Sequence, residues 1–478
     1  MEKRLLLAFS ITLVFFLGYS HVMSKYFPQQ PAAQSVSEKN STEQQLPFSE
    51  KTSAIFEPQE VQSLSLPSQT IGNFIVTYSP LGGYVESISI GTKDNILPFR
   101  DIGYLPEDKD KEFKVYISEE KIEFKGPRDS KKEYIFKDYN LTVRYSRLPS
   151  QNQLLFSNIM SPSMLNQRYQ ETFYAQEDII KRSGAKKVKN AVYKNVQYAG
   201  ARDRYYCCSL LRGSYDLELA KSKNKTYFYA FSPLSEIQFY IGPQTDKELK
   251  LYGLQGVVYY GFFHAIGMLM IKALYFFFFL TKSWGLSIIC LAILIYVILF
   301  PFTAKSTKAM RKMQQIQPAI EELKKKYKDT PQKLQKETME LYRKYKVNPL
   351  GGCLPLFFQF PIFISLYQVL FRFVELKGAS FLWINDLSVP DHLFGLPFGP
   401  PVNYFNLLPL LIVVVGLIQQ KMTISSSSSP EQKKMGLFFS VFLGVIFYNF
   451  PSALVLYWFV QNLLTLLYQV RLSKTQQN

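Results

Sequence analysis

The chain has 478 residues, a formal net charge of +18, and 47% hydrophobic and 16% aromatic residues. Its mean hydropathy is close to zero, because a lysine-rich middle region is averaged with long apolar runs near both ends. This unevenness excludes a wholly water-soluble protein and indicates a membrane protein that carries a soluble domain.

The four cysteines show neither a disulfide framework nor the spacing of zinc ligands. Cys207 and Cys208 are adjacent, and neighbouring cysteines bridge each other only with strain. We expect two small, half-buried side chains here, with a redox pair as the less favoured alternative.

Residues 1–26 start with the basic Lys3 and Arg4 and continue as an apolar run long enough to cross a bilayer. A cleaved signal peptide is the alternative. Because no small-x-small cleavage site closes the run, we expect an uncleaved transmembrane anchor with a cytoplasmic N-terminus. Residues 27–69 are rich in Pro, Gln, Ser and Glu and are expected to form a flexible linker.

Residues 70–250 change to an alternation of period two, for example at Phe113, Val115 and Ile117. Turn-forming glycines and prolines separate such runs, so the pattern predicts a soluble all-β sandwich. The region lacks a concentrated cluster of His, Asp, Glu and Cys at ligand spacing. A hydrolytic or metal site is therefore not expected, and no cofactor is expected in the chain.

The last part of the chain contains the expected membrane core. Residues 251–283 are apolar but include His264 and Lys272, so we expect an interfacial amphipathic helix whose Lys272 reaches the headgroups. With the anchor, the chain is predicted to be an α-helical polytopic membrane protein with six transmembrane helices. The other five are expected at residues 284–303, ended by Pro301, and at 350–374, 404–424, 435–450 and 451–471, the last two separated by the break from Asn449 to Ser452.

Basic residues in the short loops predict the orientation. Residues 304–349 contain thirteen basic and five acidic residues, whereas residues 375–403 contain only one basic residue, Lys377. The first loop is therefore expected in the cytoplasm and the second outside. Both termini, the loop 425–434 and the tail 472–478 are then cytoplasmic, and the β domain lies outside.

Residues 304–349 also predict a basic helical hairpin, because apolar residues recur at helical spacing on both sides of the break from Asp329 to Pro331. One interpretation is a solvated loop near anionic lipid. The other is a docking surface for emerging chains or the ribosome.

Polar residues inside the expected spans are mostly amides, and a polar group without a partner in hydrocarbon is costly. For any single amide, a hydrogen bond to another helix is the favoured interpretation, whereas several amides on different spans favour a polar-lined groove. The absence of carboxylates and histidines from the span interiors argues against proton-coupled transport. The polar residues are Tyr296, Gln359, Gln368, Gln419, Gln420, Asn449, Gln461, Asn462 and Gln469.

Short motifs follow one another through the same region. They are W-G-L-S-I-I (Trp284 to Ile289), P-F-T-A-K (Pro301 to Lys305), V-N-P-L-G-G-C-L-P (Val347 to Pro355), Q-F-P-I-F (Gln359 to Phe363), W-I-N-D-L-S (Trp383 to Ser388), Q-Q-K-M (Gln419 to Met422) and F-P-S-A-L-V-L-Y-W (Phe450 to Trp458). In this order and spacing they resemble the YidC/Oxa/Alb family of membrane protein insertases. The N-terminal anchor with an outside β domain resembles the Gram-negative branch of that family.

The resemblance implies a monomeric insertase of the bacterial inner membrane, with its β domain in the periplasm, and not an enzyme. The implied partners are nascent membrane proteins, the Sec translocon and membrane lipids, with the ribosome as a further candidate. The resemblance also implies a hydrophilic groove that receives the polar part of a client while its apolar segment slides into lipid. The matching groove positions are Tyr296, Gln420, Tyr457 and Trp458.

One position departs from the family pattern. Tyr296 stands where the family usually carries a single arginine, five residues before Pro301. Our hypothesis is that attraction of acidic client tails shifts to the groove mouth and hairpin, at Lys305, Lys308, Arg311 and Lys312, while Tyr296 offers a hydrogen bond.

Two other classes compete with this interpretation. A channel or secondary transporter fits six spans, but inverted repeats and intramembrane ionisable residues are missing from the sequence. A membrane-bound lipid or envelope enzyme would need a nucleophile with its base, or a metal cluster, and the sequence suggests neither.

Overall fold

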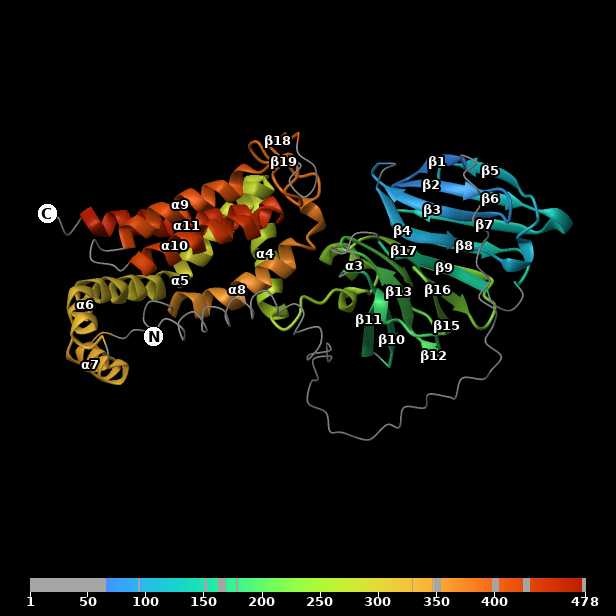
Figure 1. The fold of residues 1–478 in the computed structure, drawn as a ribbon. Helices are drawn as coiled ribbons and strands as arrows, with labels where there is room; N and C mark the ends of the chain where they lie inside the picture. The colour runs from blue at the N-terminus through green and yellow to red at the C-terminus, as the bar shows by residue number, and fades with distance from the viewer. Residues whose placement is uncertain are drawn as a thin grey trace. The chain divides into compact units, whose positions relative to one another are not determined.

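A computed structural model of the chain describes residues 66–92, 95–149, 153–161, 169–177, 179–328, 330–345, 347, 354–397, 404–423 and 430–474. The expected anchor and nearly all of the expected linker lie outside these residues. The chain divides into two compact units, Met1–Val258 and Tyr259–Asn478, which are described separately (Figure 1).

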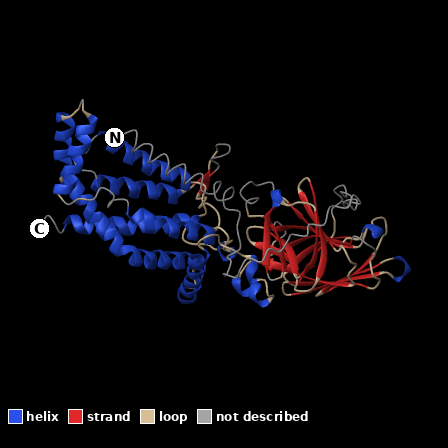
Figure 2. Ribbon diagram, turned by 90° about the horizontal axis from the view of Figure 1, so that it is seen from below, coloured by secondary structure: helices blue, strands red, loops and turns tan. Residues whose placement is uncertain are grey.

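The first unit is an all-β sandwich of two antiparallel sheets (Figure 2). The eight-stranded sheet has the order β1-β2-β3-β4-β9-β16-β15-β12. Its strands are β1 (Ser68–Ile71), β2 (Phe74–Ser79), β3 (Tyr84–Ile90), β4 (Ile96–Ile102), β9 (Gln153–Ile159), β12 (Ala191–Val196), β15 (Tyr215–Ser222) and β16 (Lys225–Ala230).

The nine-stranded sheet has the order β11-β10-β13-β14-β17-β8-β7-β6-β5. Its strands are β5 (Lys114–Ser118), β6 (Lys121–Lys125), β7 (Lys131–Lys137), β8 (Asn140–Tyr145), β10 (Glu171–Gln176), β11 (Ile179–Gly184), β13 (Tyr198–Arg202), β14 (Tyr206–Leu210) and β17 (Glu236–Pro243). The short helix α3 (Asp246–Leu251) follows the last strand. The predicted all-β sandwich is confirmed.

The core of the sandwich explains the period-two alternation. The Phe156 ring stacks on Phe228 at 4.2 Å and meets Phe239 edge-on at 6.1 Å, so the two sheets are joined by aromatic side chains. The alternation fails at one predicted run. Phe113 is buried, but Ile117 is 40% exposed because β5 is an edge strand with a neighbour on one side only.

Cys207 and Cys208 lie on β14, between β13 and β17, and are free thiols. Both side chains are completely buried, not half-buried as expected, because β14 is an inner strand of its sheet. Burial raises the pKa of both thiols, which keeps them protonated and weakly nucleophilic.

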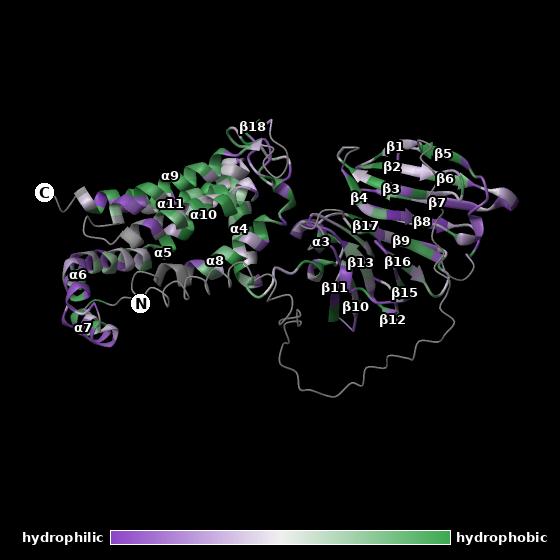
Figure 3. Ribbon diagram, in the orientation of Figure 1, coloured by the Kyte–Doolittle hydropathy of each residue, from purple (hydrophilic) through white to green (hydrophobic). Residues whose placement is uncertain are grey.

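The second unit is helical. Its helices are α4 (His264–Thr281), α5 (Trp284–Gln315), α6 (Gln317–Lys326), α7 (Pro331–Lys344), α8 (Leu354–Leu370), α9 (Leu407–Thr423), α10 (Pro430–Phe447) and α11 (Ser452–Lys474). Helix α11 contacts α5, α8 and α9, whereas α10 packs mainly on α9, and α4 packs on α5 and α8. Figure 3 shows that α9, α10 and α11 are largely hydrophobic and that α6 and α7 are largely hydrophilic.

Helix α5 does not end at Pro301, where the sequence predicted an end, but continues to Gln315. A proline removes one backbone donor and crowds the preceding turn, which bends a helix without ending it when the flanking turns are stable. The hydroxyl of Thr303 donates to the carbonyl of Leu299, and Thr307 donates to Thr303, so side chains support the turns that follow.

As predicted, two helices are separated before Pro331: α6 ends at Lys326, and Pro331 stands at the start of α7. The first arm of the hairpin begins only at Gln317, because the residues before it belong to α5. Ile316, Ile320 and Val347 form a small apolar cluster with Met313, Leu341 and Tyr342 packed around it. The hairpin is therefore anchored on the end of α5.

Among the described residues, three helices are long and apolar enough to cross a membrane: His264–Thr281, Trp284–Met313 and Ser452–Ser473. Shorter apolar helices run over Gln359–Leu370, Leu407–Met422 and Gly436–Phe447. The chain breaks between α10 and α11 at Asn449 to Ser452, as the sequence indicated. Helix α10 begins at Pro430, within the segment expected to be a loop, since proline is favoured at the first position of a helix. The total of six spans stays a prediction.

Candidate functional site

Helix α11 is joined to its neighbours by amide side chains. Gln359 Nε2 on α8 donates to the hydroxyl of Tyr457 at 3.1 Å, and Tyr457 is fully buried. Gln461 Nε2 donates to the carbonyl oxygen of Ala292 on α5 at 2.7 Å. These two amides therefore form the interhelical hydrogen bonds that were the favoured interpretation for a single residue.

A third amide joins α11 to α9. Gln419 Nε2 donates to the carbonyl oxygen of Asn462 at 2.6 Å, while Asn462 Nδ2 turns back to the carbonyl of Trp458 at 2.8 Å. Three neighbouring helices thus fix the position of α11 along its length.

Tyr296 lies on α5 and faces α11. Its hydroxyl donates to the carbonyl oxygen of Leu464 at 3.2 Å, and its ring lies 6.1 Å from that of Phe300. Tyr296 is thus a neutral contact between two helices at the position where the family resemblance implied a charge.

Gln420 lies on the other side of α9, against α10. A Cβ atom at Gly436 would lie 2.6 Å from Gln420 Nε2, so the amide occupies the space left by the missing side chain. Gly416 faces Ser440, and Gly444 faces Val413, in the same interface. Small residues therefore bring α9 and α10 close together, as is common between membrane helices.

Trp458 is the predicted site residue with an unsatisfied polar atom. Its Nε1 is buried and has no hydrogen-bond partner within the described residues. Its ring packs on Phe363 at 5.2 Å and Phe447 at 5.4 Å, which joins α11 to α8 and α10. A buried N–H without a partner is rare in folded proteins, so this atom is a candidate donor to a bound molecule.

The basic residues on the part of α5 that follows Pro301 are of two kinds. Lys305, Lys308 and Lys312 recur at helical spacing and are exposed. Arg311 instead donates to the carbonyl oxygens of Leu472 at 3.3 Å and Gln469 at 3.4 Å, at the C-terminal end of α11. A cation at a helix C-terminus stabilises its free carbonyls, so Arg311 connects α5 to α11.

Sequence reasoning missed Asp391, in the segment between α8 and α9. Its side chain is 4% exposed, and its Oδ2 accepts from the backbone N–H groups of Leu407 at 2.7 Å and Leu408 at 3.0 Å and from Trp383 Nε1 at 3.2 Å. A carboxylate at the first N–H groups of a helix satisfies donors that have no intrahelical partner. Because Asp391 is far from α9 in sequence, no local capping pattern identifies it.

The same segment also meets the start of α11. The backbone N–H and hydroxyl of Ser452 both donate to the carbonyl of Val389, and the N–H of Ala453 donates to the carbonyl of Leu387. One loop therefore caps two helices at the same end of the helical unit.

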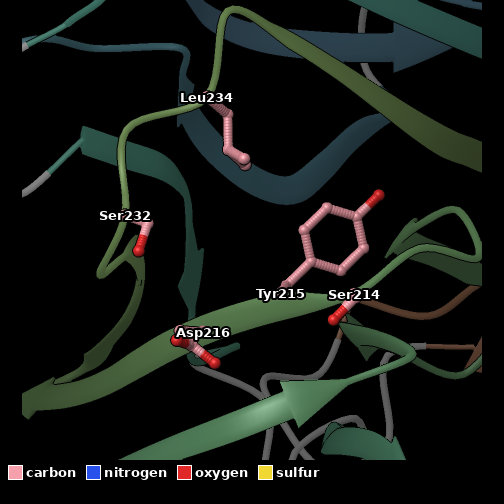
Figure 4. Close-up of a pocket in the computed structure, with 5 residues that line it drawn as sticks. All are labelled: Ser214, Tyr215, Asp216, Ser232 and Leu234. Atoms are coloured by element: carbon pink, nitrogen blue, oxygen red, sulfur yellow. The ribbon is translucent and has the colours of Figure 1, made fainter.

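A pocket in the β unit lies beside β15 and is lined by Ser214, Tyr215, Asp216, Ser232 and Leu234 (Figure 4). Its polar groups are largely engaged within the domain. Asp216 accepts from the backbone N–H of Asn195 at 2.9 Å, Ser214 donates to the Asn195 side chain at 2.9 Å, and the Tyr215 hydroxyl donates to the carbonyl of Leu211 at 3.0 Å. The residues that line this pocket therefore do not indicate a catalytic or binding site. Across the residues that the structure describes, no three His, Cys, Asp or Glu side chains gather as a metal site.

Comparisons with known proteins agree on one family. The profile of the family described as "60Kd inner membrane protein" matches residues 276–478. A relative from Wolinella succinogenes named "Membrane protein insertase YidC" is 29% identical over 99% of this chain and 95% of its own length. Relatives with the same name from Pelobacter propionicus and Syntrophobacter fumaroxidans are 39% and 42% identical, over 59% and 49% of this chain.

The alignments with the last two relatives span 55% and 43% of their length, so the chain matches about half of each. A crystal structure of an active YidC insertase overlays with a TM-score of 0.44 and 19% identity, covering 84% of this chain and 93% of that one. This overlay is too distant to carry an argument. The profile, over residues 276–478, and the curated relatives agree that the chain is similar to membrane protein insertases named YidC.

Proposed function

We propose that this protein inserts, folds and helps to assemble integral proteins of the bacterial inner membrane, alone or with the Sec translocon. The observation that carries the proposal is the set of polar groups around α11, among otherwise apolar helices. They include the unpartnered Trp458 Nε1 and the amides of Gln359, Gln419 and Gln461. Hydrogen-bonding groups inside the membrane lower the cost of carrying a polar segment through hydrocarbon.

In the proposed mechanism no bond is made or broken. The polar part of a client enters beside α11, and its apolar segment passes into lipid. Most amides in this region are already paired with other helices, so the groove presents few free donors. Trp458 Nε1 is the donor that a client carbonyl would meet without breaking an existing hydrogen bond.

The proposed membrane arrangement has six spans, both termini in the cytoplasm and the β unit in the periplasm. Helix α4 is proposed to lie in the interface. Its exposed face carries Leu269, Phe276 and Phe279 with the exposed Lys272 between them, near the middle of the helix. A spanning α4 would place this lysine in the centre of the lipid, whereas an interfacial α4 lets it reach the headgroups.

Attraction of acidic clients is proposed to come from Lys305, Lys308 and Lys312. Arg311 contributes less than the sequence suggested, because its guanidinium is bound to the end of α11. Nascent membrane proteins, lipids and the Sec translocon are the proposed partners, the ribosome is a further one, and the protein is proposed to act as a monomer.

The test is insertion of a client with an acidic tail into proteoliposomes that contain the full-length protein. Replacing Lys305, Lys308 and Lys312 by glutamine should slow insertion severalfold at low salt and little at high salt, because exposed charges are screened. Replacing Lys324, Lys325 and Lys326 by glutamine is the control with equal charge loss. A large gain from Tyr296→Arg would show instead that the groove needed a charge.

A channel or transporter is the alternative, and crosslinking discriminates between them. A photo-crosslinker at Trp458 should capture a nascent membrane protein during insertion, with Trp383 as the control position. Client-independent ion flux without crosslinked client would support the alternative.

A further inference from the structure

The second unit contains a half-buried carboxylate that the proposed mechanism does not use. Glu375 lies in the 3₁₀ turn Val374–Leu376 that follows α8. It accepts a hydrogen bond from the hydroxyl of Tyr275 on α4. Within the described part of the chain it forms no ion pair. A carboxylate that is partly withdrawn from water without a cation beside it is costly to ionise.

Aromatic rings enclose this hydrogen bond. The Tyr275 ring lies 5.7 Å from Trp284 and 5.5 Å from Phe373, and Trp284 lies 5.1 Å from Phe373. The Phe278 ring stacks on Trp284 at 4.1 Å. These contacts join the C-terminal half of α4 to the start of α5 and the end of α8, and they leave Glu375 only partly exposed to solvent.

Two further contacts hold the N-terminal half of α4 to the same side of α8. Arg372 donates to the carbonyl oxygen of Tyr259, just before α4, at 2.8 Å. At Gly267 an added Cβ would lie 3.1 Å from Val369 Cγ2, so the two helices approach closely there. Val369, Arg372 and Glu375 follow one another at helical spacing, and each meets α4 or the residues before it.

We propose that Glu375 is a positioning residue whose proton occupancy sets how firmly α4 is held against α8, and thereby sets the rate of client insertion at different periplasmic pH. The part of this inference that concerns insertion rests on the proposed function. The attachment of α4 does not depend on it.

The charged and titratable groups around this contact are few. Tyr275 faces Glu375 from α4, and the other ionisable groups of the packed elements are directed elsewhere. Arg372 reaches Tyr259, Lys282 lies 4.8 Å from the Phe279 ring, and His264 stacks on Tyr259, while Lys272 and Lys377 are exposed.

The direction of the pH effect follows from burial. Burial raises the pKa of Glu375, and the hydrogen bond from Tyr275 only partly opposes this. The attached state therefore binds the proton more tightly than a state in which α4 has left and Glu375 is hydrated. Attachment is strongest below the ordinary pKa of a glutamate and weakens as pH rises through the raised value.

The first experiment measures attachment alone, by hydrogen exchange of the α4 amides in the full-length protein in nanodiscs, corrected for intrinsic exchange rates. Glu375→Ala should speed exchange about tenfold, because a buried hydrogen bond to a carboxyl group is lost. Glu375→Gln, which mimics the protonated acid, should keep exchange slow at every pH. Tyr275→Phe is the matched variant that removes the partner hydroxyl and keeps the ring.

The second experiment measures client insertion into proteoliposomes between pH 4.5, the ordinary pKa of a glutamate, and pH 8.5. The insertion rate of the wild type should change across this pH range, whereas the insertion rate of Glu375→Gln should stay constant. Unchanged α4 exchange in Glu375→Ala, or a profile in Glu375→Gln as steep as that of the wild type, would overturn the inference. Absence of client insertion by the wild type would instead contradict the proposed function. The hydrogen-exchange experiment would still test how firmly α4 is held against α8.

Discussion

At the scale of single residues, Lys132 and Asp108 form a deeply buried ion pair in the β unit. Lys132 Nζ lies 2.8 Å from Asp108 Oδ2, with side chains 3% and 7% exposed, and it also donates to the carbonyl of Gly82. Lys111 reaches the other oxygen of Asp108 at 2.7 Å. Burial lowers the pKa of Lys132 to about 8. Lys132 depends on Asp108, because without this carboxylate its charge would be buried without compensation.

We expect Asp108→Ala to destabilise the β unit by about 3 to 5 kcal/mol, because Lys132 is left without its carboxylate. The matched control is Asp110→Ala. Asp110 forms a 3.9 Å pair with Lys109 in which both side chains are more than half exposed. Such a pair contributes about 0 to 1 kcal/mol. The stability of both variants is measured by urea unfolding of the full-length protein, followed by hydrogen exchange of the β strands. Equal losses of stability in the two variants would refute the role of the buried pair.

The same carboxylate predicts a dependence on acid. Burial alone would raise the pKa of Asp108, but Lys132 and Lys111 together lower it. Its contribution to stability is therefore present above the ordinary pKa of an aspartate and is lost as pH falls through the lowered value. The wild-type β unit should lose more stability than Asp108→Asn when the pH is lowered from 5 to 2. Parallel losses in the two proteins would contradict this.

At the scale of elements, the start of α9 depends on a residue outside the helix. Asp391→Ala removes three hydrogen bonds, including those from the N–H groups of Leu407 and Leu408. We expect a loss of about 1 to 3 kcal/mol and faster exchange of these two amides. Asp391→Asn keeps an acceptor and should retain most of the stability. Asp386→Ala, which removes the bond from the N–H of Ser388, is the control and should leave α9 unchanged.

The packing of α10 on α9 depends on glycine. A Cβ at Gly444 would lie 2.3 Å from Val413 Cγ2, whereas one at Gly416 would lie 3.1 Å from the small Ser440 hydroxyl. Gly444→Ala should therefore destabilise the pair by about 1 to 3 kcal/mol, and Gly416→Ala should cost less. Thermal unfolding in detergent ranks the two variants, and the reverse order would show that the interface does not pack as described.

These elements also show what the sequence predicts and what it does not. The sandwich and the break between α10 and α11 follow from alternation and turn residues, which are local properties. The continuation of α5 past Pro301 was missed, because packing and side-chain hydrogen bonds override a local helix breaker. The partners of Tyr296, Arg311 and Asp391 lie far away in sequence, so single-sequence reasoning named the first two residues without their contacts and missed the third.

At the scale of the whole molecule, the two compact units meet at Val258 in the chain and have different cores. The β unit is held by aromatic side chains between sheets, and the helical unit by small residues and interhelical amides. We expect two separate unfolding transitions in calorimetry of the full-length protein. Asp108→Ala should lower only the transition temperature of the β unit, and Gly444→Ala should lower only that of the helical unit, since independent sites have additive effects. A single transition that both variants shift would show that the units unfold together.

The unbroken course of α5 has a mechanical consequence. From Tyr296 to Gln315 the helix rises about 28 Å at 1.5 Å per residue, and its far end is packed against the hairpin through Met313 and Ile316. Between these two points, Arg311 joins α5 to the C-terminal end of α11 through its hydrogen bond to the carbonyl oxygen of Leu472. A force applied to the hairpin would therefore act, through the same helix, on the contact between Tyr296 and the carbonyl oxygen of Leu464 on α11.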